Sequence, residues 1–81
     1  MTILEAVAQR LTELMQEKNL TMNGLAQISA VPPSTVKNIF YGKSQNPGIV
    51  TLKLLCDGMG ITITEFFDTP VFRGLEVEEI K

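Results

Sequence analysis

The stretch over residues 21–42, TMNGLAQISAVPPSTVKNIFYG, constrains the fold more than any other part of the chain. Each half repeats apolar or small residues at helical spacing, so each half predicts a short helix with one buried face. Only Ala30 and Val31 separate the halves, too little chain for the two helices to run antiparallel. They must therefore cross steeply, which is the helix-turn-helix arrangement. The predicted inward residues are Leu25, Ala26, Ile28 and Ser29 in the first helix, and Val36, Ile39 and Phe40 in the second.

Local signals mark the ends of both helices. Thr21 stands where an N-cap is expected. Pro33 suits the first position of the second helix, where its missing N–H is no loss, and Gly42 suits the C′ position that ends it. Gly24 is unexpected because glycine costs roughly 1 kcal/mol in a helix interior relative to alanine. It indicates either a close approach of another backbone at this turn or a tolerated substitution.

Three further helices are predicted. Residues 2–18 carry an apolar stripe that begins at a capping box of Thr2 with Glu5. A helix after Gly48 has Leu52, Leu55, Cys56 and Met59 at core spacing and is predicted to end at Gly58 and Gly60. A short helix follows a second capping box, Thr62 with Glu65. We therefore expect an all-α, compact five-helix domain over residues 1–68 and an acidic, apolar tail over residues 69–81 that docks partly through Phe72 and Leu75.

Composition excludes several classes of protein. The chain has 81 residues, one cysteine and no histidine, so neither an internal disulfide nor a histidine-based catalytic or metal site can form. No apolar run approaches the ~18 residues of a membrane span, and no signal peptide is recognisable. We expect a cytoplasmic protein that is not an enzyme, binds no cofactor or metal and does not associate with a membrane.

The distribution of charge is more informative than its sum. The formal net charge is −2, but no acidic residue occurs between Lys18 and Cys56, a segment that also contains Lys37, Lys43 and Lys53. This positive segment coincides with the two crossing helices. Local field governs the encounter with phosphate, so the pattern favours nucleic acid as a partner. The alternative is a chance grouping of four lysines.

Three stretches occur in the order and spacing of a known family: LTMNGLAQISAVPPSTVKNIFYGK, NPGIVTLKLLCDGMGIT and ITITEFF. They resemble three parts of the phage-repressor and Cro-like (XRE) helix-turn-helix family. These parts are the two DNA-reading helices with their N-cap, the fourth helix that begins at a proline, and the fifth helix that begins at a cap. The resemblance implies a lambda-repressor-like fold and a sequence-specific, DNA-binding transcriptional regulator of bacterial or phage type. A repressor that places its third helix in the major groove is the simplest form of this function.

The resemblance also implies roles for individual residues. Lysine can donate to guanine O6 and N7, and asparagine can pair bidentately with adenine. Short hydroxyl side chains at the helix start are also explained by helix-start chemistry alone. Positions that face base edges are Pro33, Ser34 and Lys37, with Thr35 and Asn38 beside them; positions that meet phosphates are Thr21, Asn23, Tyr41, Lys43 and Ser44.

The sequence departs from the family pattern at three positions. Met22 replaces a common glutamine, Phe40 a common glutamate and Tyr41 a common arginine. The reading helix keeps one lysine and has no arginine, so we expect only about two to four phosphate contacts per monomer and a modest dependence of affinity on salt.

Weak binding by one domain favours a homodimer on a two-fold related DNA site. The predicted dimer contacts are Phe66, Phe67, Phe72 and Leu75. A second interpretation stays open, in which the chain is an antitoxin-like or adaptor module that binds another protein and binds DNA only weakly. The acidic net charge and the acidic, apolar tail favour that alternative.

Overall fold

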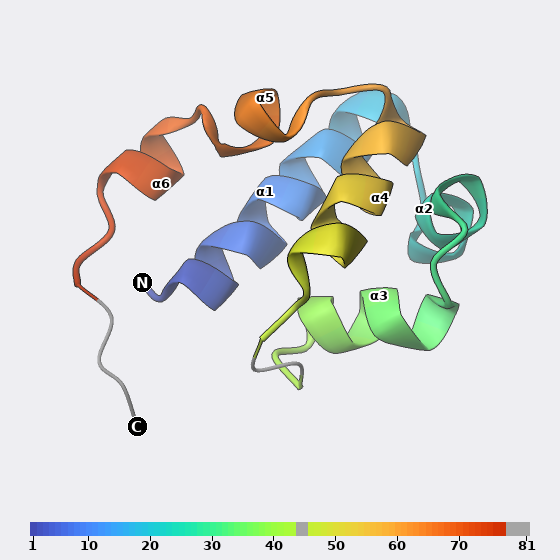
Figure 1. Ribbon diagram of the computed structural model, residues 1–81, viewed down its shortest axis with the longest axis horizontal. Helices are drawn as coiled ribbons and strands as arrows, with labels where there is room; N and C mark the ends of the chain where they lie inside the picture. The colour runs from blue at the N-terminus through green and yellow to red at the C-terminus, as the bar shows by residue number, and fades with distance from the viewer. Residues whose placement is uncertain (44–45, 78–81) are drawn as a thin grey trace.

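Six α-helices make up the part of the chain that the computed structural model describes, residues 1–43 and 46–77. Figure 1 shows the long α1 beside α4, the steeply crossed α2 and α3 at one end, α6 towards the other end, and α5 between α4 and α6. The predicted all-α class is confirmed, but the predicted count of five helices is wrong, because the tail contains a further short helix. The helices are α1 (Ile3–Lys18), α2 (Met22–Ser29), α3 (Pro33–Phe40), α4 (Ile49–Met59), α5 (Ile63–Phe67) and α6 (Pro70–Arg73).

A single apolar core contains side chains from each of the helices α1, α2, α3, α4 and α5. The stripe predicted for α4 is buried as expected, and Cys56 in that stripe is fully buried. Burial raises the pKa of the Cys56 thiol, so this side chain packs as a small apolar group. Ile28 was predicted to face inward but is 49% exposed. The largest fully buried side chains are Phe66, Leu11, Leu25, Ile39, Leu55, Val36 and Cys56.

Both predicted capping boxes are confirmed. The Glu5 amide donates to Thr2 Oγ1 at 3.1 Å, and the Thr2 amide donates to Glu5 Oε1 at 2.9 Å. Thr62 and Glu65 repeat this arrangement at the start of α5. The backbone hydrogen bond holds the pKa of each glutamate below its ordinary value of 4.5. Asn19 ends α1 in the left-handed conformation, as predicted, with φ 53°.

Gly58 has a different role from the predicted one. It was expected to help end α4, but it lies inside the helix, and Gly60 alone provides the left-handed C-cap with φ 74°. A Cβ at Gly58 would lie 2.2 Å from Ser29 Oγ and 3.0 Å from Ser29 Cα. The glycine is therefore required because α2 crosses α4 at this point.

Arg10 connects α1 to the end of α5. Its Nε donates to the Phe66 carbonyl at 2.8 Å, and its Nη2 donates to the Glu65 carbonyl at 2.9 Å. Carbonyls in the last turn of a helix lack intrahelical partners, so Arg10 supplies a donor to the Phe66 carbonyl. At the Glu65 carbonyl it is a second donor beside the Asp68 amide, which lies at 3.3 Å. The half-buried Arg10 is thus a structural residue.

The tail docks on the domain through an aromatic cluster. The Phe72 ring lies 4.8 Å from the Phe67 ring and 5.9 Å from the Phe66 ring, centroid to centroid. The predicted docking through Phe72 is therefore confirmed, and Leu75 is half-buried. Phe66 is 0% exposed, so its assignment to a dimer interface is corrected: a side chain without accessible surface cannot contact a second copy.

Candidate nucleic-acid interface

A tight turn sets the crossing of α2 and α3. Ala30 adopts the left-handed conformation with φ 54°, and the Val31 amide donates to the Ala26 carbonyl at 3.1 Å. The Val31 side chain is only 5% exposed and packs in the core. Sequence reasoning missed this anchor, although an apolar residue just after a left-handed helix end is a known signal for such a contact.

The two prolines start α3 without a side-chain cap. Pro33 occupies the first turn, and the Pro32 carbonyl accepts the amides of Thr35 at 3.0 Å and Val36 at 3.3 Å. Val36 and Ile39 are 0% and 1% exposed. This buried pair fixes the rotation of α3, and its opposite side faces solvent.

That outward side is a stripe of side chains able to form hydrogen bonds. Ser34, Lys37, Asn38 and Tyr41 are all exposed and follow one another at i, i+3, i+4 and i+7, so they share one face of the helix. We call these four residues the reading face. Of the other residues assigned to base edges, Pro33 is exposed at the helix start and Thr35 is half-buried beside the face.

The end of α3 also has a defined geometry. Gly42 has φ 70°, and the Lys43 amide donates to the Asn38 carbonyl at 3.0 Å, the closure of a Schellman motif. Lys43 is therefore exposed directly after the reading face. Ser44, also assigned to phosphate, lies outside the described residues.

The start of α2 supplies the other predicted phosphate contacts. Thr21 Oγ1 accepts the Gly24 amide at 3.0 Å, which leaves the hydroxyl proton free to donate, and Asn23 is exposed in the first turn. A Cβ at Gly24 would lie 3.2 Å from Thr21 Oγ1. The absence of a side chain at Gly24 thus leaves room for the N-cap of its own helix, and no other helix approaches it within 4 Å among the described residues.

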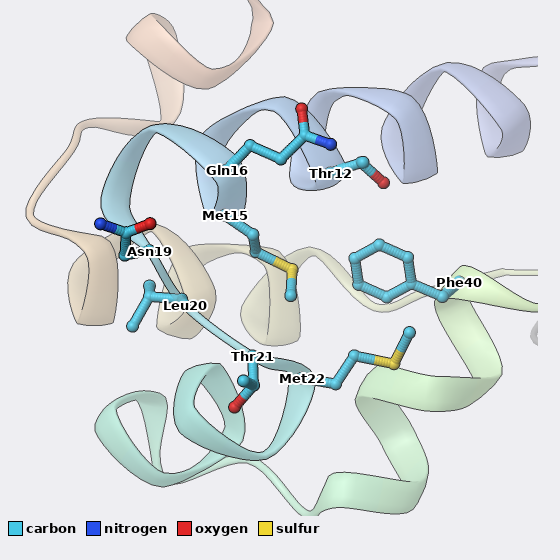
Figure 2. Close-up of a pocket in the computed structure, with 8 residues that line it drawn as sticks. All are labelled: Thr12, Met15, Gln16, Asn19, Leu20, Thr21, Met22 and Phe40. Atoms are coloured by element: carbon cyan, nitrogen blue, oxygen red, sulfur yellow. The ribbon is translucent and has the colours of Figure 1, made fainter.

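Two of the three departures from the family pattern meet in one hollow. Figure 2 shows Met22 and Phe40 pointing toward each other beside Met15. The hollow between α1, the start of α2 and the end of α3 has a volume of about 470 Å³. An apolar contact between α2 and α3 therefore stands where the family commonly has polar side chains. The lining residues are Thr12, Met15, Gln16, Asn19, Leu20, Thr21, Met22 and Phe40.

The four lysines of the positive segment fall into two groups. Two have an acidic neighbour, and two lie on or directly after α3. Lys53 forms an ion pair with Asp57, and Lys18 is close enough to help lower the pKa of Glu65. Lys37 on the reading face and Lys43 directly after it have no ion-pair partner within residues 1–43 and 46–77. The positive charge available to phosphate is therefore concentrated on and just after α3.

The comparisons with known proteins agree with this geometry. The model of the Cro/C1-type HTH DNA-binding domain matches residues 10–70, more than half of the 81-residue chain. The chain belongs to this family. It is similar to a solved structure, the crystal structure of the prophage Lp1 protein 11, with 36% identity over 91% of this chain and 97% of that one, and a TM-score of 0.80. No curated protein matches the chain.

Family membership identifies helices α2 and α3, which we call the reading pair. The α2–turn–α3 unit is the helix-turn-helix of a Cro/C1-type DNA-binding domain, as the resemblance predicted. No group of three or more acidic or cysteine side chains suited to a metal occurs in the described part of the chain. Within the same residues, no helix is both long and apolar enough to cross a membrane.

Proposed function

We propose that this Cro/C1-type protein is a transcriptional repressor that inserts α3 into the major groove and reads bases with Ser34, Lys37 and Asn38. Lys37 donates to guanine, and the Asn38 amide pairs with adenine. Thr21, Asn23, Tyr41 and Lys43 hold the phosphates on either side. A repressor of this kind acts by occupying its operator.

The reading face is the single observation that carries this proposal. Its side chains are exposed on a helix whose other side is locked by Val36 and Ile39, so they are presented from a rigid element. A free lysine and a free amide on such a helix suit base edges in the major groove, which is wide enough to admit an α-helix.

The same geometry supports a homodimer on a two-fold related site. One domain offers only Lys37 and Lys43 as free cations beside the reading face within the described residues. Two such contacts supply little nonspecific affinity at physiological salt, and a second copy doubles both the base contacts and the phosphate contacts.

The test is selection from a random-sequence DNA pool, followed by fluorescence-anisotropy titration of the selected site. The wild type is compared with Lys37→Ala/Asn38→Ala. A matched control, Lys18→Ala/Gln9→Ala, removes one lysine and one amide from exposed positions of α1. We expect the wild type and the control to select the same site, and the double variant to lose about 2–6 kcal/mol of discrimination if both contacts are bidentate. Selection of the same site by the double variant would contradict the proposal.

One observation favours the protein-interaction module as a second candidate. The apolar hollow beside Met22 and Phe40 borders the reading pair and carries little polar surface. The same titration separates the two candidates, because an interaction module binds every sequence equally and no better than a few phosphate contacts allow.

A further inference from the structure

The first turn of α2 and the end of α3 lie at the margin of the apolar core. The buried residues of α2 begin at Leu25, and those of α3 end at Ile39. Beyond these limits each helix has one half-buried apolar side chain that packs against the core, Met22 in α2 and Phe40 in α3. These two side chains therefore anchor the helix ends that the buried residues do not reach.

The two anchoring side chains face each other. Figure 2 shows the Met22 side chain and the Phe40 ring pointing toward one another, with Met15 of α1 beside them. All three line the same hollow. A thioether beside an aromatic ring is a favourable contact, and because neither group is charged, salt does not screen it. We call Met22 and Phe40 the bridging pair.

The neighbours of the bridging pair along the chain are the residues proposed to contact phosphate. Thr21 and Asn23 flank the member of the pair in α2, and both are exposed. Tyr41 and Lys43 follow the member in α3 within three residues, and both are also exposed. The contact within the bridging pair therefore sets the spacing between the phosphate contacts at the start of α2 and those at the end of α3.

A fixed spacing favours binding to a duplex. Contacts to phosphates position a protein on DNA but carry no sequence information. Groups that are already held in place need not be ordered when the complex forms, so less affinity is lost to ordering. A loose end of α2 or α3 would have to be ordered on binding, and the resulting loss of affinity would be the same for every DNA sequence.

We propose that Met22 and Phe40 are positioning residues for DNA binding, which hold the two groups of phosphate contacts at the spacing that the DNA backbone requires. The inference rests on the proposed function for the identity of those contacts. The bridging pair acts through its neighbours, because a thioether and a phenyl ring have no hydrogen-bond donor to offer a phosphate.

The experiment is a double-mutant cycle of Met22→Ala, Phe40→Ala and the variant with both changes. Phe72→Ala is the matched control, because Phe72 is also half-buried against the core but belongs to α6, towards the other end of the molecule from α3 (Figure 1). Met22→Leu is the conservative variant, since leucine and methionine exchange with little cost. Urea unfolding gives the folded fraction of each protein. Fluorescence anisotropy gives the affinity of that fraction for the selected site and for a scrambled duplex of the same composition.

We expect the folded fraction of each single alanine variant to bind both duplexes about tenfold more weakly while it prefers the same site, because loosened phosphate contacts weaken every complex alike. The variant with both changes should bind no more weakly than the weaker single variant, because either change alone removes the contact. Phe72→Ala should lose stability but keep the affinity of the wild type, and Met22→Leu should match the wild type in both measurements.

Alanine variants whose folded fraction binds as tightly as the wild type would overturn the inference. Losses that add in the variant with both changes, or an equal loss of affinity in Phe72→Ala, would overturn it as well. If Phe40→Ala does not fold, the comparison of Met22→Ala with Met22→Leu decides the question. If the wild type prefers no sequence but the alanine variants still bind every duplex more weakly, the inference stands and base reading in the proposed function fails. A wild type that binds no duplex would contradict both.

Discussion

Single residues decide how closely the helices of this domain approach. Gly58 and Ser29 form the contact between α4 and α2, and the Ser29 hydroxyl is buried without a hydrogen-bond partner among the described residues. The missing side chain at Gly58 allows this approach, and the approach in turn holds α2, the first helix of the reading pair. A residue outside α2 and α3 therefore helps to orient them.

Replacing Gly58 by alanine should destabilise the fold. The new Cβ would come within 2.2 Å of Ser29 Oγ and 3.0 Å of Ser29 Cα. We expect a loss of about 1–3 kcal/mol in the free energy of unfolding, measured by urea denaturation. Gly74→Ala is the control, because a Cβ there meets nothing closer than 3.8 Å.

Adding Ser29→Ala should restore part of the stability lost in Gly58→Ala, because it removes the hydroxyl at the closest contact and a buried group that lacks a partner. An unchanged stability of Gly58→Ala alone would show that α2 and α4 can separate without cost. That result would contradict the role assigned to this glycine.

Some residue assignments depend on contacts that the sequence does not contain. Gly58 follows an apolar stripe and stands two residues before another glycine, so its local pattern is that of a helix end. Only the position of Ser29, 29 residues earlier, explains its place inside α4. Similarly, Phe66 and Phe67 have the same local pattern, and tertiary packing decides that Phe66 alone is fully buried.

At the scale of elements, local chemistry predicted most of the helices. Each capping box joins residues three positions apart, and Asn19 and Gly42 end their helices through their own backbone conformation. Such signals are complete within a few residues, which is why the starts of α1 and α5 could be predicted. The bond from Arg10 to the end of α5 spans more than fifty residues and has no local signal.

The capping boxes should make stability depend on acid. The pKa values of Glu5 and Glu65 lie below the ordinary 4.5 in the folded chain, so folding favours their charged forms. The stability they contribute is present above the ordinary pKa and is lost as pH falls through the lowered value. We expect Glu5→Gln/Glu65→Gln to lose less stability than the wild type between about pH 5 and pH 3.

Urea unfolding at a series of pH values measures this difference. Glutamine can still accept in a capping box, so the helices should form in the variant. Glu17→Gln, which removes an exposed carboxylate of α1 outside both capping boxes, is the control. Identical pH profiles for the double variant and the wild type would contradict the contribution of the capping boxes.

At the scale of the whole molecule, an acidic chain carries a local positive region on and just after α3. The net charge is −2, yet Lys37 lies on α3 and Lys43 lies just after it, and the acidic residues lie mainly in α1 and after α4. The sequence predicted this separation, but only the fold shows that Lys53 is paired with Asp57 and so adds little. We therefore expect a number of phosphate contacts per monomer near the lower end of the range of about two to four that the sequence predicts.

The dependence of affinity on salt should be correspondingly small. Two phosphate contacts per monomer give a slope of log K against log salt of about −4 for a dimer, and four contacts would give about −7. Lys43→Ala should reduce the steepness by about 1 per monomer and leave the selected sequence unchanged. Lys18→Ala should match the wild type. An affinity that does not change between low and moderate salt would exclude phosphate contact at these lysines.

The measurement that tests the central claim most directly replaces guanines of the selected site, one at a time, with 7-deazaguanine. This base lacks the N7 acceptor of the major groove but keeps its Watson–Crick pairing. If Lys37 donates to guanine from α3, one replacement should cost the wild type about 1–3 kcal/mol and cost Lys37→Ala almost nothing. Equal losses in the two proteins, or no loss at any guanine, would contradict base reading by Lys37 in the major groove.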